Sequence, residues 1–338
     1  MDYKQSGVDI EAGEKAVSEI KNIVRKTYNS NVLTELGSFG GLYNLDLSKW
    51  KEPVMVASTD GVGTKLIIAQ KAKKYDTIGQ DLINHCVNDI FVQGAIPQFF
   101  LDYIGVSRLD VKIIKIIIEG MAQACIENGL SLIGGEMAEM PDIYQGNDFD
   151  LVGTIIGLVE KSNLITGSQI QNGDVIIGYP SNGLHTNGYT LARKIIFDKL
   201  KLGIDSYVPE INSTIKDSLL QIHKTYFPML KKWAYPEMIH GMAHITGGGL
   251  EGNLKRIIPE GLIAYIDCKS WEIPSLFQWL VTEGEIKINE AFKSFNMGIG
   301  FVIITSKEKS EEFLQENNSI IIGNIQRKNN GKKVLLNF

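Results

Sequence analysis

The residues with the clearest capacity for chemistry form a short glycine loop at 60–65, DGVGTK, which follows an apolar run at 53–58. Its two glycines allow backbone N–H groups to turn toward an anion, Lys65 adds a positive charge, and Asp60 can reach a metal ion. The spacing differs from the Walker A pattern GxxxxGKS/T and from the dinucleotide pattern GxGxxG. The loop therefore indicates a phosphate site of another kind. Taken alone, it is explained equally well as an ordinary glycine turn with a surface lysine.

A second group of polar residues lies at 79–89 with the spacing of a helix. Four of them fall at i, i+4, i+7 and i+8, which is one face of a helix: Asp81, His85, Asn88 and Asp89. Carboxylates with an amide on one face suit Mg²⁺, which binds through oxygen ligands and phosphates. A solvated helix face is the alternative, and the apolar neighbours of Asn88 and Asp89 speak against it. His85 taken alone is expected to be a packing or surface histidine.

A third candidate is the turn at 134–136, GGE, at the end of a predicted strand. The two glycines permit the close approach of a ligand, and Glu136 could then join the metal ligands of the other two motifs. A turn with exposed glutamates fits the same residues. The motif therefore predicts a metal ligand only when it is taken together with the other two motifs.

The second half of the chain adds two motifs, HTNG at 185–188 and HITGGG at 244–249. His185 beside polar groups at a helix entrance could transfer protons, because the pKa of histidine lies near neutrality. The glycines at 247–249 open another helix, whose free N–H groups would bind an anion. A capping or surface histidine and a glycine hinge are the respective alternatives.

The elements that must position these motifs follow from hydrophobic periodicity and turn residues. The first half predicts strands at 53–58, 99–106, 130–133 and 150–159 and helices at 14–26, 76–94 and 110–127. The second half predicts strands at 175–179, 262–266, 299–304 and 319–325 and helices at 189–201, 215–233, 250–257, 274–282 and 307–315. Because strands and helices mix without strict βαβ alternation, an α+β fold is favoured over a doubly wound sheet. A polar and turn-rich segment near 161–171 predicts a boundary between two domains, 1–165 and 166–338.

Bulk properties exclude several classes of protein. The chain has 338 residues, of which 44% are hydrophobic and 22% charged, as in a globular protein of about two domains. Its net charge of −5 argues against a nucleic-acid or anionic-membrane partner. No apolar stretch approaches the ~20 residues of a membrane span. Three cysteines without CxxC spacing indicate a reducing compartment, so that we expect a cytoplasmic protein.

The motifs also occur in a characteristic order along nearly the whole chain. They are SGVDIEAG at 6–13, DGVGTKL at 60–66, GQDLINHCVNDIFVQGA at 79–95, GGEMAEMPDIY at 134–144, HTNGYTLARK at 185–194, HITGGG at 244–249 and FNMGIG at 295–300. In this order they resemble the phosphoribosylformylglycinamidine cyclo-ligase family, also called aminoimidazole ribonucleotide synthetases. One departure is Met297, where a cysteine is common in the family, so that we assign no catalytic thiol there.

The resemblance implies an activity and an assembly. Such enzymes convert formylglycinamidine ribonucleotide and ATP to aminoimidazole ribonucleotide, ADP and phosphate, and they use Mg²⁺. They are homodimers of two α+β domains per chain, in which the N-terminal sheets of both subunits close a central barrel. The N-terminal domain would bind ATP and form the dimer, and the C-terminal mixed sheet with its helices would contribute to the substrate cleft.

The resemblance, with the residue types above, also implies roles at individual positions. The implied metal ligands are Asp60, Asp81, Asp89 and Glu136. The implied ATP-phosphate group is Asp60, Gly61, Gly63, Thr64, Lys65 and Asn88. Substrate would contact Asn187, Thr246, Gly247, Gly248 and Gly249. Catalysis would depend on His185, as the proton carrier, with Lys65 and Asp89.

Related ATP-using enzymes and a binding protein are the alternatives. A selenophosphate synthetase would need a reactive cysteine or selenocysteine near its N-terminal glycine loop, and no cysteine precedes Cys86. A thiamin-monophosphate kinase would show an acidic pair in place of Gly61 and Val62, and a formylglycinamidine ribonucleotide synthetase has a longer chain or separate partner subunits. A non-enzymatic nucleotide-binding protein would have lost acidic residues that this chain retains.

Overall fold

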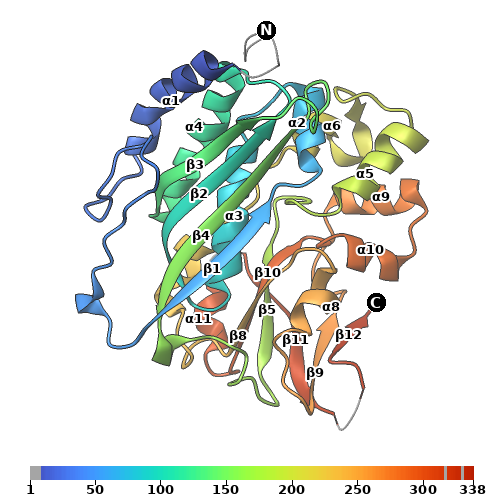
Figure 1. Cartoon of the computed structure of the whole chain (residues 1–338). Coiled ribbons are helices and arrows are strands. Elements are labelled where there is room, and N and C mark those ends of the chain that lie inside the picture. The colour runs from blue at the N-terminus through green and yellow to red at the C-terminus, as the bar shows by residue number, and fades with distance from the viewer. Residues whose placement is uncertain (1–8, 316–317, 329–330) are drawn as a thin grey trace. The chain divides into compact units, whose positions relative to one another are not determined.

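Helices and mixed sheets make up the computed structural model, which describes residues 9–315, 318–328 and 331–338 (Figure 1). The start of the motif at 6–13 therefore lies outside the described residues. The α+β class predicted from the sequence is confirmed. Among the described helices, none is both long and apolar enough to cross a membrane.

The chain divides into two compact units after Glu160. The first unit runs to Phe91 and continues from Ala95 to Glu160, whereas the second contains Val92–Gly94 and the residues from Lys161 onward. This division lies a few residues before the one predicted from the sequence, because Lys161 already belongs to the second unit.

The first unit is built on a four-stranded sheet with the order β1-β4-β2-β3. Its strands are β1 (Pro53–Gly61), β2 (Ile96–Val106), β3 (Ser131–Glu139) and β4 (Phe149–Glu160). The β2–β3 pair is parallel and the other two pairs are antiparallel. Its helices are α1 (Ile10–Arg25), α2 (Lys65–Ala72), α3 (Ile78–Phe91) and α4 (Val111–Asn128).

Close packing of α3 explains how this helix comes to carry buried polar residues. A Cβ atom on Gly79 would lie 2.1 Å from the carbonyl oxygen of Ile117 on α4, and one on Gly120 would lie 2.8 Å from that of Asp76. Glycine at both positions therefore lets the two helices approach each other closely. The opposite side of α3 contacts β1 and β4. The helix is thus enclosed on nearly all sides, and its polar residues need partners inside the unit.

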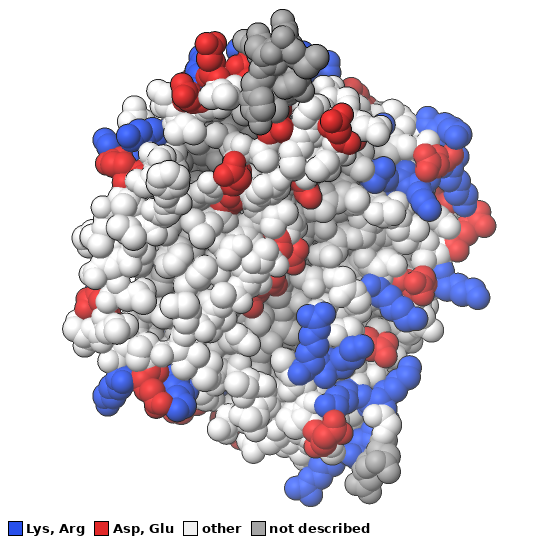
Figure 2. All heavy atoms as spheres, in the orientation of Figure 1, with Lys and Arg blue, Asp and Glu red and all other residues white. Residues whose placement is uncertain are grey.

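None of the described helices of this unit covers the other face of the four-stranded sheet (Figure 1). Along the edge strand β1, the side chains of Met55, Ala57 and Thr59 are exposed, and Met55 retains 56% of its accessible surface. Ile96 at the start of β2 is 47% exposed. Figure 2 shows few Lys or Arg side chains over this sheet. The face is therefore an open and weakly charged surface.

The second unit is built on a six-stranded sheet with the order β12-β9-β11-β5-β10-β8. The strands are β5 (Val175–Pro180), β8 (Gly241–His244), β9 (Leu262–Asp267), β10 (Ile299–Thr305), β11 (Ile320–Arg327) and β12 (Val334–Asn337). Only the β9–β12 pair among them is parallel. Strand β10 is buried at every residue, which explains its continuous apolar sequence. A separate pair joins β6 (Tyr207–Val208) and β7 (Ser213–Thr214).

Short helices surround this sheet. They are α5 (Tyr189–Arg193), α6 (Ile215–Leu219), α7 (Phe227–Leu230), α8 (Gly249–Leu254), α9 (Ser275–Gly284), α10 (Ile288–Ser294) and α11 (Ser310–Leu314). The single helix predicted at 215–233 is wrong, because residues 221–226 form an irregular segment between α6 and α7. Pro228 has no N–H group, so it fits only in the first turn of a helix, and that turn is the start of α7.

Candidate functional site

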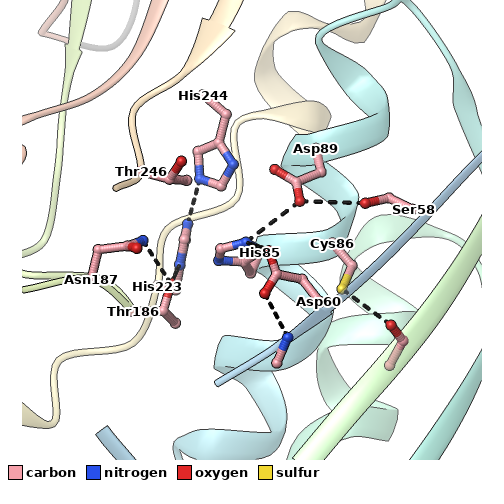
Figure 3. Close-up of polar contacts among 12 residues, drawn as sticks. Ser58, Asp60, His85, Cys86, Asp89, Thr186, Asn187, His223, His244 and Thr246 are labelled. Atoms are coloured by element: carbon pink, nitrogen blue, oxygen red, sulfur yellow. Dashed lines mark hydrogen bonds and ion pairs between the residues drawn. The ribbon is translucent and has the colours of Figure 1, made fainter. Parts of the chain in front are cut away.

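Two carboxylates and a histidine meet where β1 ends beside α3 (Figure 3). Asp60 is the penultimate residue of β1, whereas His85 and Asp89 lie one turn apart on α3. The Nε2 atom of His85 lies 2.9 Å from Oδ2 of Asp60 and 3.4 Å from Oδ2 of Asp89. The Ser58 hydroxyl donates a hydrogen bond of 3.5 Å to the same oxygen of Asp89. The structure therefore brings together Asp60 and Asp89 of the predicted site.

His85 is an ion-pair partner in this group. Burial acts to lower the pKa of its imidazole, but hydrogen bonds and charges from Asp60 and Asp89 outweigh burial and raise the pKa to about 9. The ring is therefore a cation at neutral pH. Its hydrogen bond lowers the pKa of Asp60 in turn, so that this carboxylate stays ionised. The sequence pattern alone predicts a packing or surface histidine at position 85. The available signal for this ion pair is the i, i+4 spacing of His85 and Asp89 on one helix face.

The same group has the donor atoms of a cation site. One ligand atom each from Asp60, His85 and Asp89 lies within 4.8 Å of the other two. Carboxylate oxygens are the ligands that Mg²⁺ prefers, so the two aspartates fit that ion, which would replace the positive charge of His85 between them. Neither Asp81 nor Glu136 belongs to this group.

Asp81 instead pairs with Lys65 inside the first unit. The Lys65 Nζ atom, at the first residue of α2, lies 2.8 Å from Oδ2 of Asp81 on α3, and both side chains are fully buried. Burial lowers the pKa of Lys65, and the charge of Asp81 acts in the opposite direction. From the sequence, Lys65 is predicted to bind the ATP phosphates and Asp81 to bind the metal ion. In the structure the lysine points inward, because an enclosed α3 requires an ion-pair partner for its buried carboxylate.

In the loop at 60–65, the backbone around Gly63 is therefore accessible to solvent, whereas the side chain of Lys65 is buried. Gly63 has φ +67°, which is the left-handed region that favours glycine, and Gly63 and Thr64 are exposed where α2 begins. A Cβ atom on Gly61 would lie 3.0 Å from the carbonyl oxygen of Leu151, so that glycine keeps β1 close to its neighbour. Asn88, assigned to the same phosphate group, is buried on α3.

Glu136 lies at another place in the first unit. It is exposed on β3 and lines a cavity of about 380 Å³ with residues of α1 and of the loop at 35–40. Asp102 on the adjacent strand β2 also lines this cavity, and burial raises its pKa to about 7. A Cβ atom on Gly135 would lie 2.3 Å from Oδ1 of Asp102, so this glycine makes room for the carboxyl group. No motif in the sequence marks Asp102, because it lies inside a strand.

In the second unit, His185 lies in a turn before α5 with φ +61°, an uncommon value for a residue other than glycine. Its ring is buried, and Nε2 accepts a hydrogen bond of 3.2 Å from the backbone N–H of Asn182. The Nε2 atom of the neutral ring is therefore the acceptor, and Nδ1 carries the proton. Asn187 donates to the Thr186 hydroxyl over 3.4 Å, so the two polar residues that follow the histidine in this motif are joined to each other.

The glycines at 247–249 connect β8 to α8. Gly248 and Gly249 both have positive φ, and a Cβ atom on Gly249 would lie 1.7 Å from the carbonyl oxygen of Phe292. The N–H of Gly248 donates to the carbonyl of Lys293, and that of Gly249 donates to the carbonyl of Thr246. These two N–H groups therefore hold the loop in place, which differs from the free anion donors expected from the sequence.

Asn253 on α8 supports the same loop from the other side. Its side-chain amide donates to the backbone carbonyls of Thr246, Gly247 and Gly249 over 3.3, 3.4 and 2.9 Å. Asn253 lies outside the motifs singled out from the sequence, although a polar residue one turn after a glycine loop is a signal for such support.

Comparisons with known proteins cover both units. The AIR synthase related protein N-terminal domain matches residues 45–159, and the corresponding C-terminal domain matches residues 171–332. The fold alone is shared with more distant structures. A thiamine-monophosphate kinase from Stenotrophomonas maltophilia superposes with a TM-score of 0.67 at 15% identity, over 94% of this chain and 96% of that chain. The hydrogenase maturation protein HypE in complex with ATP superposes with a TM-score of 0.65 at 17% identity, over 96% and 90%.

Much closer relatives carry the name phosphoribosylformylglycinamidine cyclo-ligase. The protein from Thermodesulfovibrio yellowstonii is 48% identical over 92% of this chain and 91% of its own. Those from Alkaliphilus oremlandii and Trichlorobacter lovleyi are 46% and 44% identical, over 90% of both chains and over 99% and 98%, respectively. At such identities over nearly the full length of both chains, the protein belongs to the phosphoribosylformylglycinamidine cyclo-ligase family.

Proposed function

We propose that this chain catalyses the ATP-dependent ring closure of formylglycinamidine ribonucleotide to aminoimidazole ribonucleotide, a step of purine synthesis. The single observation that carries the proposal is the meeting of Asp60 and Asp89 beside an exposed glycine loop. This arrangement suits a nucleotide phosphate with its cation, and it occurs in a chain whose relatives carry the name of this activity.

The chemistry explains why phosphate binding is central. The formyl oxygen of the substrate is a poor leaving group, so ATP first phosphorylates it and leaves as ADP. A nitrogen of the amidine side then attacks the activated carbon, the C–O bond breaks, and inorganic phosphate departs as the ring closes. Phosphoryl transfer depends on positioning and charge neutralisation more than on covalent catalysis. Holding both ends of one substrate together also lowers the entropic part of the closure barrier.

In the first unit, Asp60 and Asp89 would hold Mg²⁺, which neutralises phosphate charge when it is bound. The exposed backbone of Gly63 and Thr64 at the start of α2 would face the phosphates. The cavity that contains Glu136 has a size found in ligand pockets and would take the nucleoside part of ATP. Lys65 and Asp81 would support the loop from beneath through their ion pair.

In the second unit, His185 is the proposed proton carrier. Its ring orientation is fixed by the hydrogen bond from Asn182, and an imidazole can bind and release a proton near neutral pH. Asn187 would orient the substrate. Because Gly248 and Gly249 use their N–H groups within the loop, the backbone of Thr246 and Gly247 would hold the substrate phosphate in the loop that Asn253 fixes.

The open face of the four-stranded sheet supports a homodimer in which two such sheets form one barrel. Exposed apolar side chains on a weakly charged face are typical of protein–protein contacts. We expect Met55→Asp to give a folded monomer, because the side chain is solvent-exposed within one chain but would be buried in the dimer. Sedimentation velocity measures the change, with Met55→Leu as the control that should remain dimeric. A wild-type protein that sediments as a monomer would contradict the dimer.

The activity itself is tested with purified protein. Incubation with formylglycinamidine ribonucleotide, ATP and Mg²⁺ should give aminoimidazole ribonucleotide and ADP in equal amounts, measured by chromatography and a coupled ADP assay. Omission of the ribonucleotide should stop ADP release. ADP release without the imidazole product would contradict the proposed ring closure.

A further inference from the structure

His223 lies outside every motif found in the sequence, yet it is the centre of a buried polar group in the second unit. It belongs to the irregular segment at 221–226 between α6 and α7, and its side chain is fully buried. Its ring stacks on that of His185, with centroids 4.1 Å apart and planes 22° from parallel. Figure 3 shows it between Thr186 and His244. One residue thus contacts both motifs that the proposed function uses in this unit.

The hydrogen bonds of His223 couple the donor and acceptor roles of His244 and Thr186. Its Nε2 atom lies 2.9 Å from Nε2 of His244, the last residue of β8, and its Nδ1 atom lies 3.3 Å from the hydroxyl of Thr186. Two ring nitrogens at this distance share one proton, so one is the donor and the other the acceptor. If neutral His223 donates through Nε2, its Nδ1 accepts from Thr186; if it accepts from His244, its Nδ1 donates to Thr186. The tautomer of His244 therefore fixes the direction of the hydrogen bond between His223 and Thr186.

The stacked contact fixes the ring of His185 on one side. A second contact comes from β10, where a Cβ atom on Gly300 would lie 2.5 Å from Cε1 of His185 and 2.1 Å from the Tyr226 hydroxyl oxygen. The ring of His185 therefore packs against His223 and close to the backbone of Gly300, while the N–H of Asn182 donates to its Nε2 atom. With its backbone at positive φ, His185 depends on such surroundings to keep one orientation.

We propose that His223 is a positioning residue for ring closure. It holds the imidazole of His185 in place by stacking, and through its two nitrogens it sets the hydrogen-bond direction at Thr186 and His244. It need not contact substrate. The proposal rests on the proposed function, because it concerns the histidine that we assign to proton transfer.

Three replacements of His223 test its hydrogen bonds, and one of them does so while an aromatic ring remains against His185. Phe keeps an aromatic ring against His185 but removes both nitrogens, Gln keeps a polar group that can reach His244, and Asn is too short to reach it. For His223→Phe and His223→Asn we expect kcat to fall by up to about 100-fold, as for a small misplacement of a catalytic group, with KM for the ribonucleotide within about twofold of wild type. His223→Gln should recover several-fold of the lost kcat. The control is His240→Gln, which removes another histidine bond of this unit, 2.7 Å to Asp174, and should leave kcat unchanged.

A second readout does not depend on turnover. Nitrogen-15 spectra of the histidine rings should show a hydrogen-bonded Nε2 on His244 in the wild type and in His223→Gln, and its loss in His223→Phe and His223→Asn. Wild-type kcat in both Phe and Asn variants, a change in KM alone, or equal kcat for Asn and Gln would overturn the proposal. If Phe does not fold, the comparison of Asn with Gln decides. An inactive wild type would contradict the proposed function instead, and the ring spectra would still test the His223–His244 bond.

Discussion

Replacement of Asp89 by asparagine should lower kcat for ring closure by about 100- to 1,000-fold, the range for loss of one group that stabilises charge in a transition state. The side chains have nearly the same shape, so the change removes one negative charge beside Asp60 and His85 and little else. One ligand charge fewer should also raise the Mg²⁺ concentration needed for half-maximal rate. Steady-state kinetics at varied Mg²⁺ measure both effects.

The control for this change is Asp76→Asn. Asp76 is an exposed aspartate of the same unit whose carboxylate lies 3.4 Å from Lys74 at the surface. It should leave kcat and the Mg²⁺ dependence unchanged, because surface pairs of this kind contribute little. Circular dichroism should show a folded protein for both variants. Near-normal turnover of Asp89→Asn at low Mg²⁺ would remove Asp89 from the cation site.

The site in the first unit shows how far sequence patterns extend. The glycine loop after a strand and the spacing of residues on α3 were enough to place Asp60 and Asp89 in one site. The same spacing placed Asp81 on that face, but Asp81 is paired with Lys65. Helical periodicity gives the angle between side chains and not what surrounds the helix. The surroundings of α3 are set by α4 and the sheet. These elements are distant in the sequence, so a local pattern contains no information about them.

The second unit shows a different limit. Local patterns predicted its central strands, because β5 and β10 are apolar along their whole length. They gave a continuous helix at 215–233 where the chain instead bends inward and buries His223. Pro228 was the available signal, since a proline rarely lies inside a helix. The contacts of His223 with His185 and His244 join three separate segments, and only the tertiary structure brings these segments together.

Replacement of Lys65 by methionine should destabilise the first unit by about 3–5 kcal/mol, the usual cost of removing one partner of a buried ion pair. Methionine fills a similar volume, but it leaves the fully buried carboxylate of Asp81 without the ammonium group now 2.8 Å away. The double variant Lys65→Met with Asp81→Leu should recover most of this loss, because an apolar pair has no charge to desolvate. Urea unfolding of the single and double variants measures the difference. Equal stability of Lys65→Met and wild type would contradict the ion pair.

The double variant also separates the two roles open to Lys65. If the lysine acts only by holding the loop against α3, the double variant should recover kcat together with stability, since the backbone of Gly63 and Thr64 is again supported. If Lys65 turns toward the phosphates when ATP binds, the double variant should be stable but remain inactive. The inward geometry favours the first result, because moving the ammonium outward would leave Asp81 charged and buried without it. Stability and kcat measured on the same samples distinguish the two.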